Sequence, residues 1–183
     1  MAYRNKTYVC FDADNDMRYY NLMKAWKENE NIAFDFHNAH ELNNLRTWSS
    51  KETIKRKLRE RLQNTKMFIV LVGEHTRYLY KFVRWEIEYA IEKDIPIIAV
   101  NLNNKRIKDS ALCPPLLRDE LAIHIPYKQK IIDYALNNWG NSHKKYRQAN
   151  KTGAYHYKDS VYKSLEIDIY LHYAKKSPPL PWR

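Results

Sequence analysis

Short apolar runs rich in β-branched and aromatic residues alternate with longer segments of helical periodicity along the first 127 residues. One of them, "KMFIVLVG" at residues 66–73, is apolar throughout after its lysine, which is typical of a central strand of a parallel sheet. Strands joined by helical crossovers form a sheet with helices on both faces. The sequence therefore predicts an α/β fold with a five-stranded, doubly wound and mainly parallel sheet. The strands are expected at residues 7–12, 32–37, 66–73, 95–102 and 121–127.

The two most apolar runs, at residues 66–72 and 95–100, are expected at the centre of the sheet together with the first strand. This arrangement favours the flavodoxin-like strand order 2-1-3-4-5. Sheets of this order bind ligands in a crevice outside the carboxyl ends of the first and third strands. Polar residues that follow those two strands are therefore candidate site residues.

Beyond residue 127 the alternation weakens. Residues 128–183 are interpreted as a C-terminal extension packed on an α/β domain of residues 1–127, with an extended tail from about residue 176. A helix at the start of the extension is expected to end at Gly140. Residues 127–183 hold 11 Lys and Arg against 4 Asp and Glu, so most of the net charge of +11 lies there. A basic, aromatic-rich surface suits solubility, an anionic small molecule, a subunit interface or nucleic acid.

The chain has only three glycines, far apart in the sequence. Phosphate loops of the dinucleotide or Walker type need several glycines in one short window, so any nucleotide must be held by side chains and helix ends. His37 and His40 have i, i+3 spacing, but no further His or Cys accompanies them, and a zinc site needs four ligands. No metal site is expected.

Cys10 and Cys113 fall in or beside predicted buried segments, which favours a reducing compartment. The first residues lack the apolar region of a signal peptide, and no apolar run is long enough to span a bilayer. The sequence thus predicts a cytoplasmic protein without a membrane segment.

One carboxylate stands out in the helix expected before the fourth strand. At about 100° per residue, Arg84, Glu88 and Glu92 line one solvated flank. Glu86 falls away from that flank, between two apolar patches. A carboxylate on an apolar face is costly unless it is paired or faces a cavity. Glu86 is therefore either a satisfied structural acid or a group that points into a site.

The candidate residues at the two strand ends are Phe11, Asp12 and Asp14 after the first strand and His75, Thr76 and Arg77 after the third. Asp also favours strand-to-helix turns, so Asp12 and Asp14 suit a binding role and plain turn chemistry equally. The pattern does not match the haloacid-dehalogenase phosphatases, because Asp16 stands where Thr or Val is required. It does not match a response-regulator receiver either, since Glu74 replaces the Asp expected after the third strand.

Residues 73–100, "GEHTRYLYKFVRWEIEYAIEKDIPIIAV", resemble the third-strand loop, helix and fourth strand of TIR domains, most closely the TIR-like family of the bacterial Thoeris antiphage system. "YVCFDADND" at the first strand and "SSKETIKRKLRERLQNTKMFIVLVG" through the third resemble the same family, so the resemblance covers roughly residues 5–127. Phe82 and Tyr80 depart from it, because many TIR domains carry Trp and a small hydroxyl residue there.

This resemblance implies that Glu86 is the catalytic acid and that the protein cleaves the nicotinamide–ribose bond of NAD. It implies a cyclic or modified ADP-ribose product that signals to a nucleotide-sensing effector protein, and self-association of the chain. NAD is then a substrate, with no permanently bound cofactor and no metal.

The substrate-binding residues on this interpretation are Phe11, Asp12, Asp14, Trp48, His75, Thr76, Arg77 and Trp85. The aromatic rings would stack on adenine or nicotinamide. Arg77 would meet the pyrophosphate, and the two Asp side chains would orient ribose hydroxyls.

A second function class stays open, a non-catalytic TIR-type module that binds a partner protein. Nucleic-acid binding is a third class, favoured only by the basic, aromatic stretch within residues 143–164.

Overall fold

The computed structural model describes residues 6–28, 35–37, 50–79 and 81–167. Its strands, α-helices and 3₁₀-helices (η) are β1 Lys6–Cys10, α1 Met17–Glu28, β2 Asp35–His37, α2 Lys51–Leu62, β3 Met67–Val72, η2 Thr76–Tyr78, α3 Phe82–Glu92, β4 Ile97–Asn101, η3 Pro115–Leu117, β5 Ala122–Pro126, α4 Gln129–Gln148, β6 Ala154–Tyr155 and α5 Asp159–Ser164. None of the helices in these ranges has the length and apolar character needed to cross a membrane.

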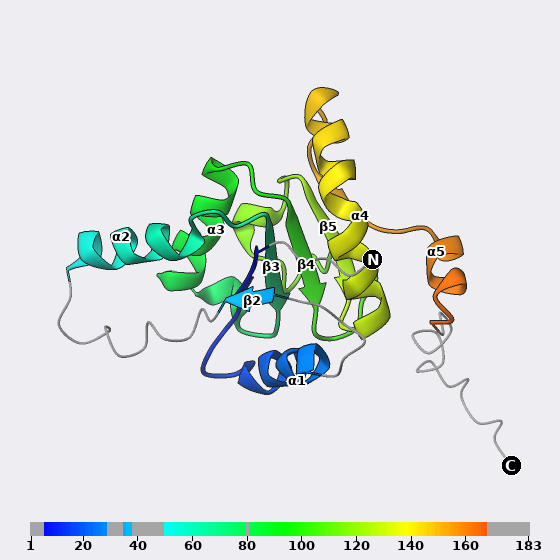
Figure 1. The fold of residues 1–183 in the computed structure, drawn as a ribbon, viewed down its shortest axis with the longest axis horizontal. Coiled ribbons are helices and arrows are strands. Elements are labelled where there is room, and N and C mark those ends of the chain that lie inside the picture. The colour runs from blue at the N-terminus through cyan, green and yellow to red at the C-terminus, as the bar shows by residue number, and fades with distance from the viewer. Residues whose placement is uncertain (1–5, 29–34, 38–49, 80, 168–183) are drawn as a thin grey trace, which may run out of the picture.

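The strands of the described ranges form one sheet in the order β2-β1-β3-β4-β5-β6, and every neighbouring pair is parallel. The predicted α/β fold is confirmed, and the first five strands follow the order that the apolar runs predict. Figure 1 shows the sheet between two groups of helices. Because β1 lies beside β3, the carboxyl ends of these two strands are neighbours.

The sixth strand corrects the expected number of five. β6 pairs with β5 over two residues only, Ala122 with Ala154 and Ile123 with Tyr155. A strand this short contains no alternation of apolar and polar residues that a sequence pattern can reveal.

Two apolar cores cover the two faces of the sheet. Side chains alternate along β1, so Val9 faces α1 and α4, whereas Tyr8 faces α2, α3 and η3. Every residue of β3 is buried, as expected for a central strand with helices on both sides. The two faces matter for the site, because residues adjacent in sequence at the end of β1 belong to different cores.

The prediction that the first helix of the extension ends at Gly140 is wrong, because α4 continues beyond it. Trp139 and His143 are both buried, so the apolar face of the helix runs through the glycine. A glycine ends a helix where the chain turns left-handed, and here Asn150 adopts that conformation, with φ of 51°.

The described part of the extension packs on the sheet. Ile131 and Ile132 of α4 lie in the same core as Val9. Arg106, from the segment after β4, pairs with Asp159 of α5, and its guanidinium lies 4.0 Å from the centroid of the Tyr162 ring. The domain boundary at residue 127 stays a prediction, and the tail expected from about residue 176 lies outside the described residues.

Candidate functional site

Glu86 lies on α3 and points toward the sheet. Its side chain is only 5% exposed, and the phenol of Tyr8 on β1 donates a hydrogen bond of 3.0 Å to its Oε1. Arg84 and Glu88 form an exposed ion pair of 2.7 Å on another flank of the helix. The carboxylate therefore occupies the apolar face that its helical angle predicts, but its partner is a strand residue that helix periodicity alone does not reveal.

Two groups near Glu86, the Tyr8 phenol and the Cys10 thiol, have raised pKa values. Burial, and next the charge of Glu86, raises the pKa of the Tyr8 phenol well above its ordinary value. The same two causes raise the pKa of the buried Cys10 thiol. Tyr8 and Cys10 thus stay protonated near neutral pH, and the site combines a fixed carboxylate with a neutral phenol and a neutral thiol.

Trp85 packs between two helices. Its ring is half-buried, lies 5.7 Å from that of Phe82 in an edge-on arrangement, and has the Lys55 ammonium of α2 at 5.1 Å from its centroid. These contacts show Trp85 in a packing role at the junction of α2 and α3.

Phe11 lies on the other side of the sheet from Glu86. Its ring stacks on Tyr20 of α1, with centroids 4.6 Å apart, and it belongs to the core that α1 and α4 cover. The expectation that Phe11 joins Glu86 in one pocket fails on this placement, because alternation along β1 turns Tyr8 and Phe11 to opposite faces.

Asp12 shapes the turn between β1 and α1. It is 2% exposed, and its two carboxylate oxygens accept hydrogen bonds from the Asp14 N–H at 3.0 Å and the Asn15 side-chain amide at 2.7 Å. Asp14 itself is exposed. The structure thus shows the turn chemistry that Asp favours at Asp12, whereas Asp14 and Glu74 are carboxylates that solvent reaches.

Asp16, four positions after Asp12, is a second buried acid between the end of β1 and α1. It is 6% exposed, and its Oδ2 has no hydrogen-bond partner among the described residues. Gly73, after β3, lies against it: a Cβ there would be 2.7 Å from Oδ1 and 2.9 Å from Cγ of Asp16. The glycine leaves room for the carboxyl group between the ends of β1 and β3. The isolated Gly73 at a strand end is the one sequence signal for this contact.

Asp16 is expected to make stability depend on pH. Burial, followed by the charge of Asp12, raises its pKa from 3.8 to about 6. The folded state then holds a proton that the unfolded state releases near pH 4, so stability falls as pH rises from about 4 to about 6. Asp16→Asn should remove this slope and raise the free energy of unfolding at pH 7 by about 1–2 kcal/mol relative to wild type.

Urea unfolding at a series of pH values checks this expectation. Asp14→Asn, which changes an exposed carboxylate of the same turn, is the matched control and should keep the wild-type slope. An identical slope in wild type and Asp16→Asn would show that the carboxyl group titrates alike in both states.

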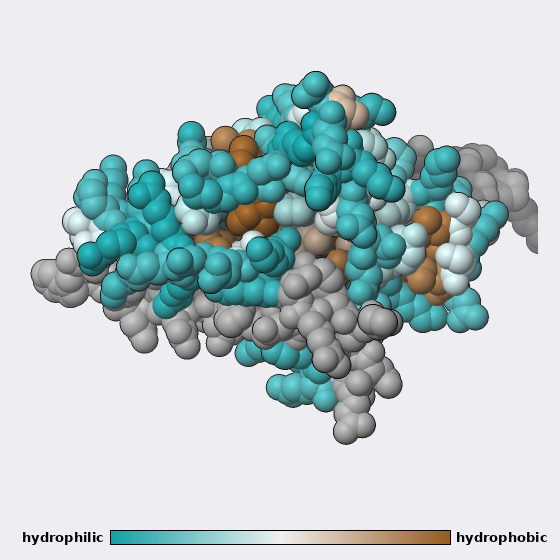
Figure 2. Space-filling view, turned by 45° about the horizontal axis from the view of Figure 1, so that its top comes forward, coloured by the Kyte–Doolittle hydropathy of each residue, from teal (hydrophilic) through white to brown (hydrophobic). Residues whose placement is uncertain are grey.

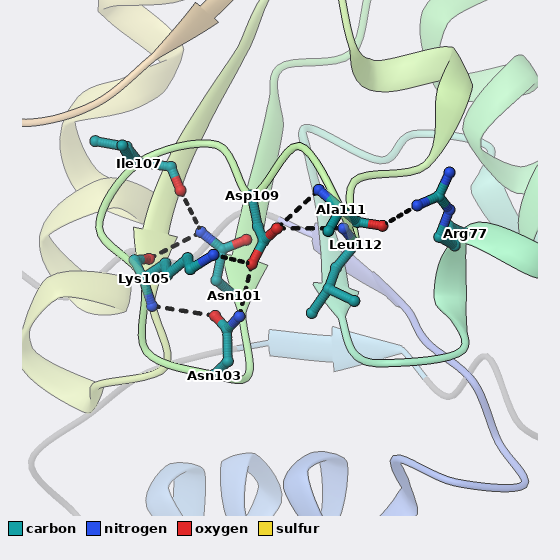
Figure 3. Close-up of polar contacts among 8 residues, drawn as sticks. All are labelled: Arg77, Asn101, Asn103, Lys105, Ile107, Asp109, Ala111 and Leu112. Carbon is teal, nitrogen blue, oxygen red and sulfur yellow. Dashed lines mark hydrogen bonds and ion pairs between the residues drawn. The ribbon is translucent and has the colours of Figure 1, made fainter. Parts of the chain in front are cut away.

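The three residues expected after β3 have separate roles. Thr76 is buried, and its Oγ1 accepts from the Gly73 N–H at 2.9 Å and donates to the Leu71 carbonyl at 3.2 Å. His75 is exposed, and its charge acts to lower the pKa of Asp16. Arg77 donates to the Ala111 carbonyl in the segment between β4 and η3 (Figure 3).

Trp48 and His40 lie outside the described residues, and the side chain of His37 is likewise not described. Within the described ranges, no three His, Cys, Asp or Glu side chains are grouped so that they could hold a metal ion.

The arrangement gives two kinds of chemistry. Glu86 is a buried acid held by the Tyr8 phenol, and a carboxylate in such a nearly dry environment would stabilise a positive charge far better than in water. Asp14 is exposed two positions before Asp16, and its carboxylate oxygens could accept hydrogen bonds from hydroxyl groups of a ligand.

The part of the chain that contains Glu86 matches a known protein family. A family model described as Thoeris protein ThsB, TIR-like domain, matches residues 8–107. The match begins in β1 and extends past β4, so it includes Tyr8, Asp16, Gly73 and Glu86 and ends before β5. The chain belongs to the TIR-like domain family of the Thoeris protein ThsB, which implies a role in antiphage defence.

Proposed function

We propose that the protein is an NAD-processing enzyme of antiphage defence, which cleaves the nicotinamide–ribose bond. The observation that carries the proposal is Glu86, a carboxylate that is 5% exposed and held by the Tyr8 phenol on the helix that follows β3. Family membership supplies the defence role, and the carboxylate supplies the chemistry.

The reaction needs one fixed negative charge. When the C1′–N bond breaks, its electron pair leaves with nicotinamide, and the ribose becomes an oxocarbenium-like cation. A carboxylate held beside that carbon stabilises the cation or orients the ribose hydroxyls. Attack by water gives ADP-ribose with release of a proton, and attack by a nucleophile of the ADP-ribose itself gives a cyclic product. NAD is consumed as a substrate, and the proposal requires neither a metal nor a permanently bound cofactor.

The product would act as a diffusible signal to a nucleotide-sensing effector protein in the cytoplasm. Self-association is part of the proposal, since a neighbouring subunit would complete a site of which this chain supplies Glu86. His75 and Asp14 are the described residues placed best for ribose hydroxyls, because both are exposed at the carboxyl edge of the sheet.

A non-catalytic interaction module is the second candidate. The observation in its favour is that Glu86 is buried against Tyr8, as a satisfied structural acid is. In that case the carboxylate stabilises the contact between α3 and β1, and function lies on the exposed surface.

The test incubates the purified full chain with NAD, alone and with lysate of phage-infected cells, and resolves the products by mass spectrometry. Loss of NAD with release of nicotinamide is expected, and the mass of the second product separates linear ADP-ribose from a cyclic isomer, which lacks one water. Stable NAD in every condition, with the protein folded by circular dichroism, would favour the interaction module.

A further inference from the structure

A cavity of about 210 Å³ lies between α3 and η3, on a different flank of α3 from Glu86. Its apolar wall is formed by Leu79 and Val83 on one side and by Pro115 and Leu116 on the other. Ile87 also lines it, one position after Glu86 and hence about 100° around the helix. Glu86 faces Tyr8 and is not among the lining residues, although the candidate residues Thr76 and Arg77 are.

Two guanidinium groups bring positive charge to this cavity. Arg77 and Arg84 both line it, and its lining contains no acidic side chain. The Nη1 of Arg77 donates to the Ala111 carbonyl, and the Nε of Arg84 pairs with Glu88. Each guanidinium carries five N–H donors in a fixed plane, so these contacts leave further donors that match a carboxylate or a phosphate.

A network around Asp109 organises the segment that leads from β4 to η3 (Figure 3). Asp109 is 3% exposed; it accepts from the Ala111 N–H at 2.9 Å and the Asn103 amide at 2.7 Å, and pairs with Lys105 at 2.7 Å. Burial alone would raise its pKa, but the hydrogen bonds from Lys105 and Asn103 lower it to about 2.

The segment that Asp109 organises also holds Arg77. Asn101, at the end of β4, donates to the carbonyls of Lys105 and Ile107 at 2.8 and 2.9 Å, which closes the first part of the segment. Figure 3 shows Arg77 reaching this segment from η2, through the Ala111 carbonyl. The cation is thus positioned before any ligand arrives, which lowers the entropy lost on binding.

The size of the cavity limits its ligand. Pockets for drug-sized ligands span roughly 300–1,000 Å³, so a cavity of about 210 Å³ holds a body of about one ring and excludes a whole dinucleotide. Figure 2 shows a face of the molecule that is mostly hydrophilic, with only small apolar patches. Among the residues that the structure describes, no broad apolar surface for a protein partner appears on that face.

We infer that this cavity binds a small organic anion, with a body of about one ring against Leu79, Val83 and Leu116 and a carboxylate or phosphate on Arg77 and Arg84. The inference does not depend on NAD processing, because the anion would be held by Arg77, Arg84 and the apolar wall, without Glu86.

The test is a titration of the isotope-labelled full chain with phenyl phosphate, followed by amide chemical shifts. Saturable shifts are expected at residues of α3 and η3. Benzyl alcohol, which has a similar ring and no charge, should bind at least tenfold more weakly. The double variant Arg77→Met/Arg84→Met should bind phenyl phosphate at least tenfold more weakly than wild type. Arg56→Met, at an exposed arginine of α2, should leave the affinity unchanged.

Leu116→Trp keeps both arginines and fills the cavity, so it should abolish the saturable shifts even if removal of Arg77 disturbs the segment around Asp109. Any of three results would overturn the inference. Phenyl phosphate could cause no saturable shift, or its chemical shift changes could fall at residues outside α3 and η3. It could also bind Leu116→Trp as tightly as wild type.

Discussion

Glu86→Gln is expected to lower the rate of NAD consumption at least about 100-fold, to the limit of detection, while the chain stays folded. The amide has nearly the volume of the carboxylate and still accepts the hydrogen bond from Tyr8, but it carries no charge to stabilise an oxocarbenium-like cation. A 100-fold loss corresponds to about 2.7 kcal/mol of transition-state stabilisation. Initial rates by mass spectrometry, with thermal unfolding on the same samples, measure both parts of the expectation.

Glu88→Gln is the matched control for this variant. Glu88 lies two positions further along α3, is exposed and pairs with Arg84, so the same chemical change there should leave the rate within about twofold, because exposed pairs contribute little. Equal rates in wild type and Glu86→Gln would remove Glu86 from the chemistry. Equal losses in both variants would show that α3 responds to any lost charge.

Gly73→Ala is expected to destabilise the protein by about 1–3 kcal/mol, as overpacking of a dense interior does. The new methyl group would enter the space of the Asp16 carboxyl group, which is buried and anchored at the start of α1. Either the ends of β1 and β3 move apart or Asp16 leaves its position. Urea unfolding monitored by circular dichroism measures the change in free energy.

Gly140→Ala gives the opposite expectation and serves as the comparison. Gly140 lies inside α4, and its new Cβ would meet Met67 at 3.7 Å, an ordinary contact. Alanine favours a helix over glycine by about 1 kcal/mol, so this variant should be more stable than wild type. The account of Asp16 fails if Gly73→Ala is as stable as wild type.

Sequence patterns predict correctly those features of the fold that depend on one strand or one helix alone. The uninterrupted apolar run before Gly73 places β3 at the centre of the sheet, and a period of 3.6 residues places Glu86 on the inner face of α3. Both predictions need only the geometry of one strand or one helix.

The patterns failed where two distant elements meet. Tyr8 and Glu86 are 78 positions apart, and the hydrogen bond between them depends on how α3 crosses β1. The packing of Phe11 on Tyr20 likewise depends on strand alternation together with the helix that covers each face of the sheet. Gly140 was read as a helix end although the apolar face continues to His143.

The two cysteines give the native chain a chemical signature. Cys10 and Cys113 are buried, and burial first of all raises the pKa of both thiols, that of Cys113 to about 11. Only thiolates react rapidly with alkylating agents and oxidants. Both thiols should therefore resist iodoacetamide and peroxide in the folded protein and react only as it unfolds, so that the alkylation rate reports on its opening without an engineered label.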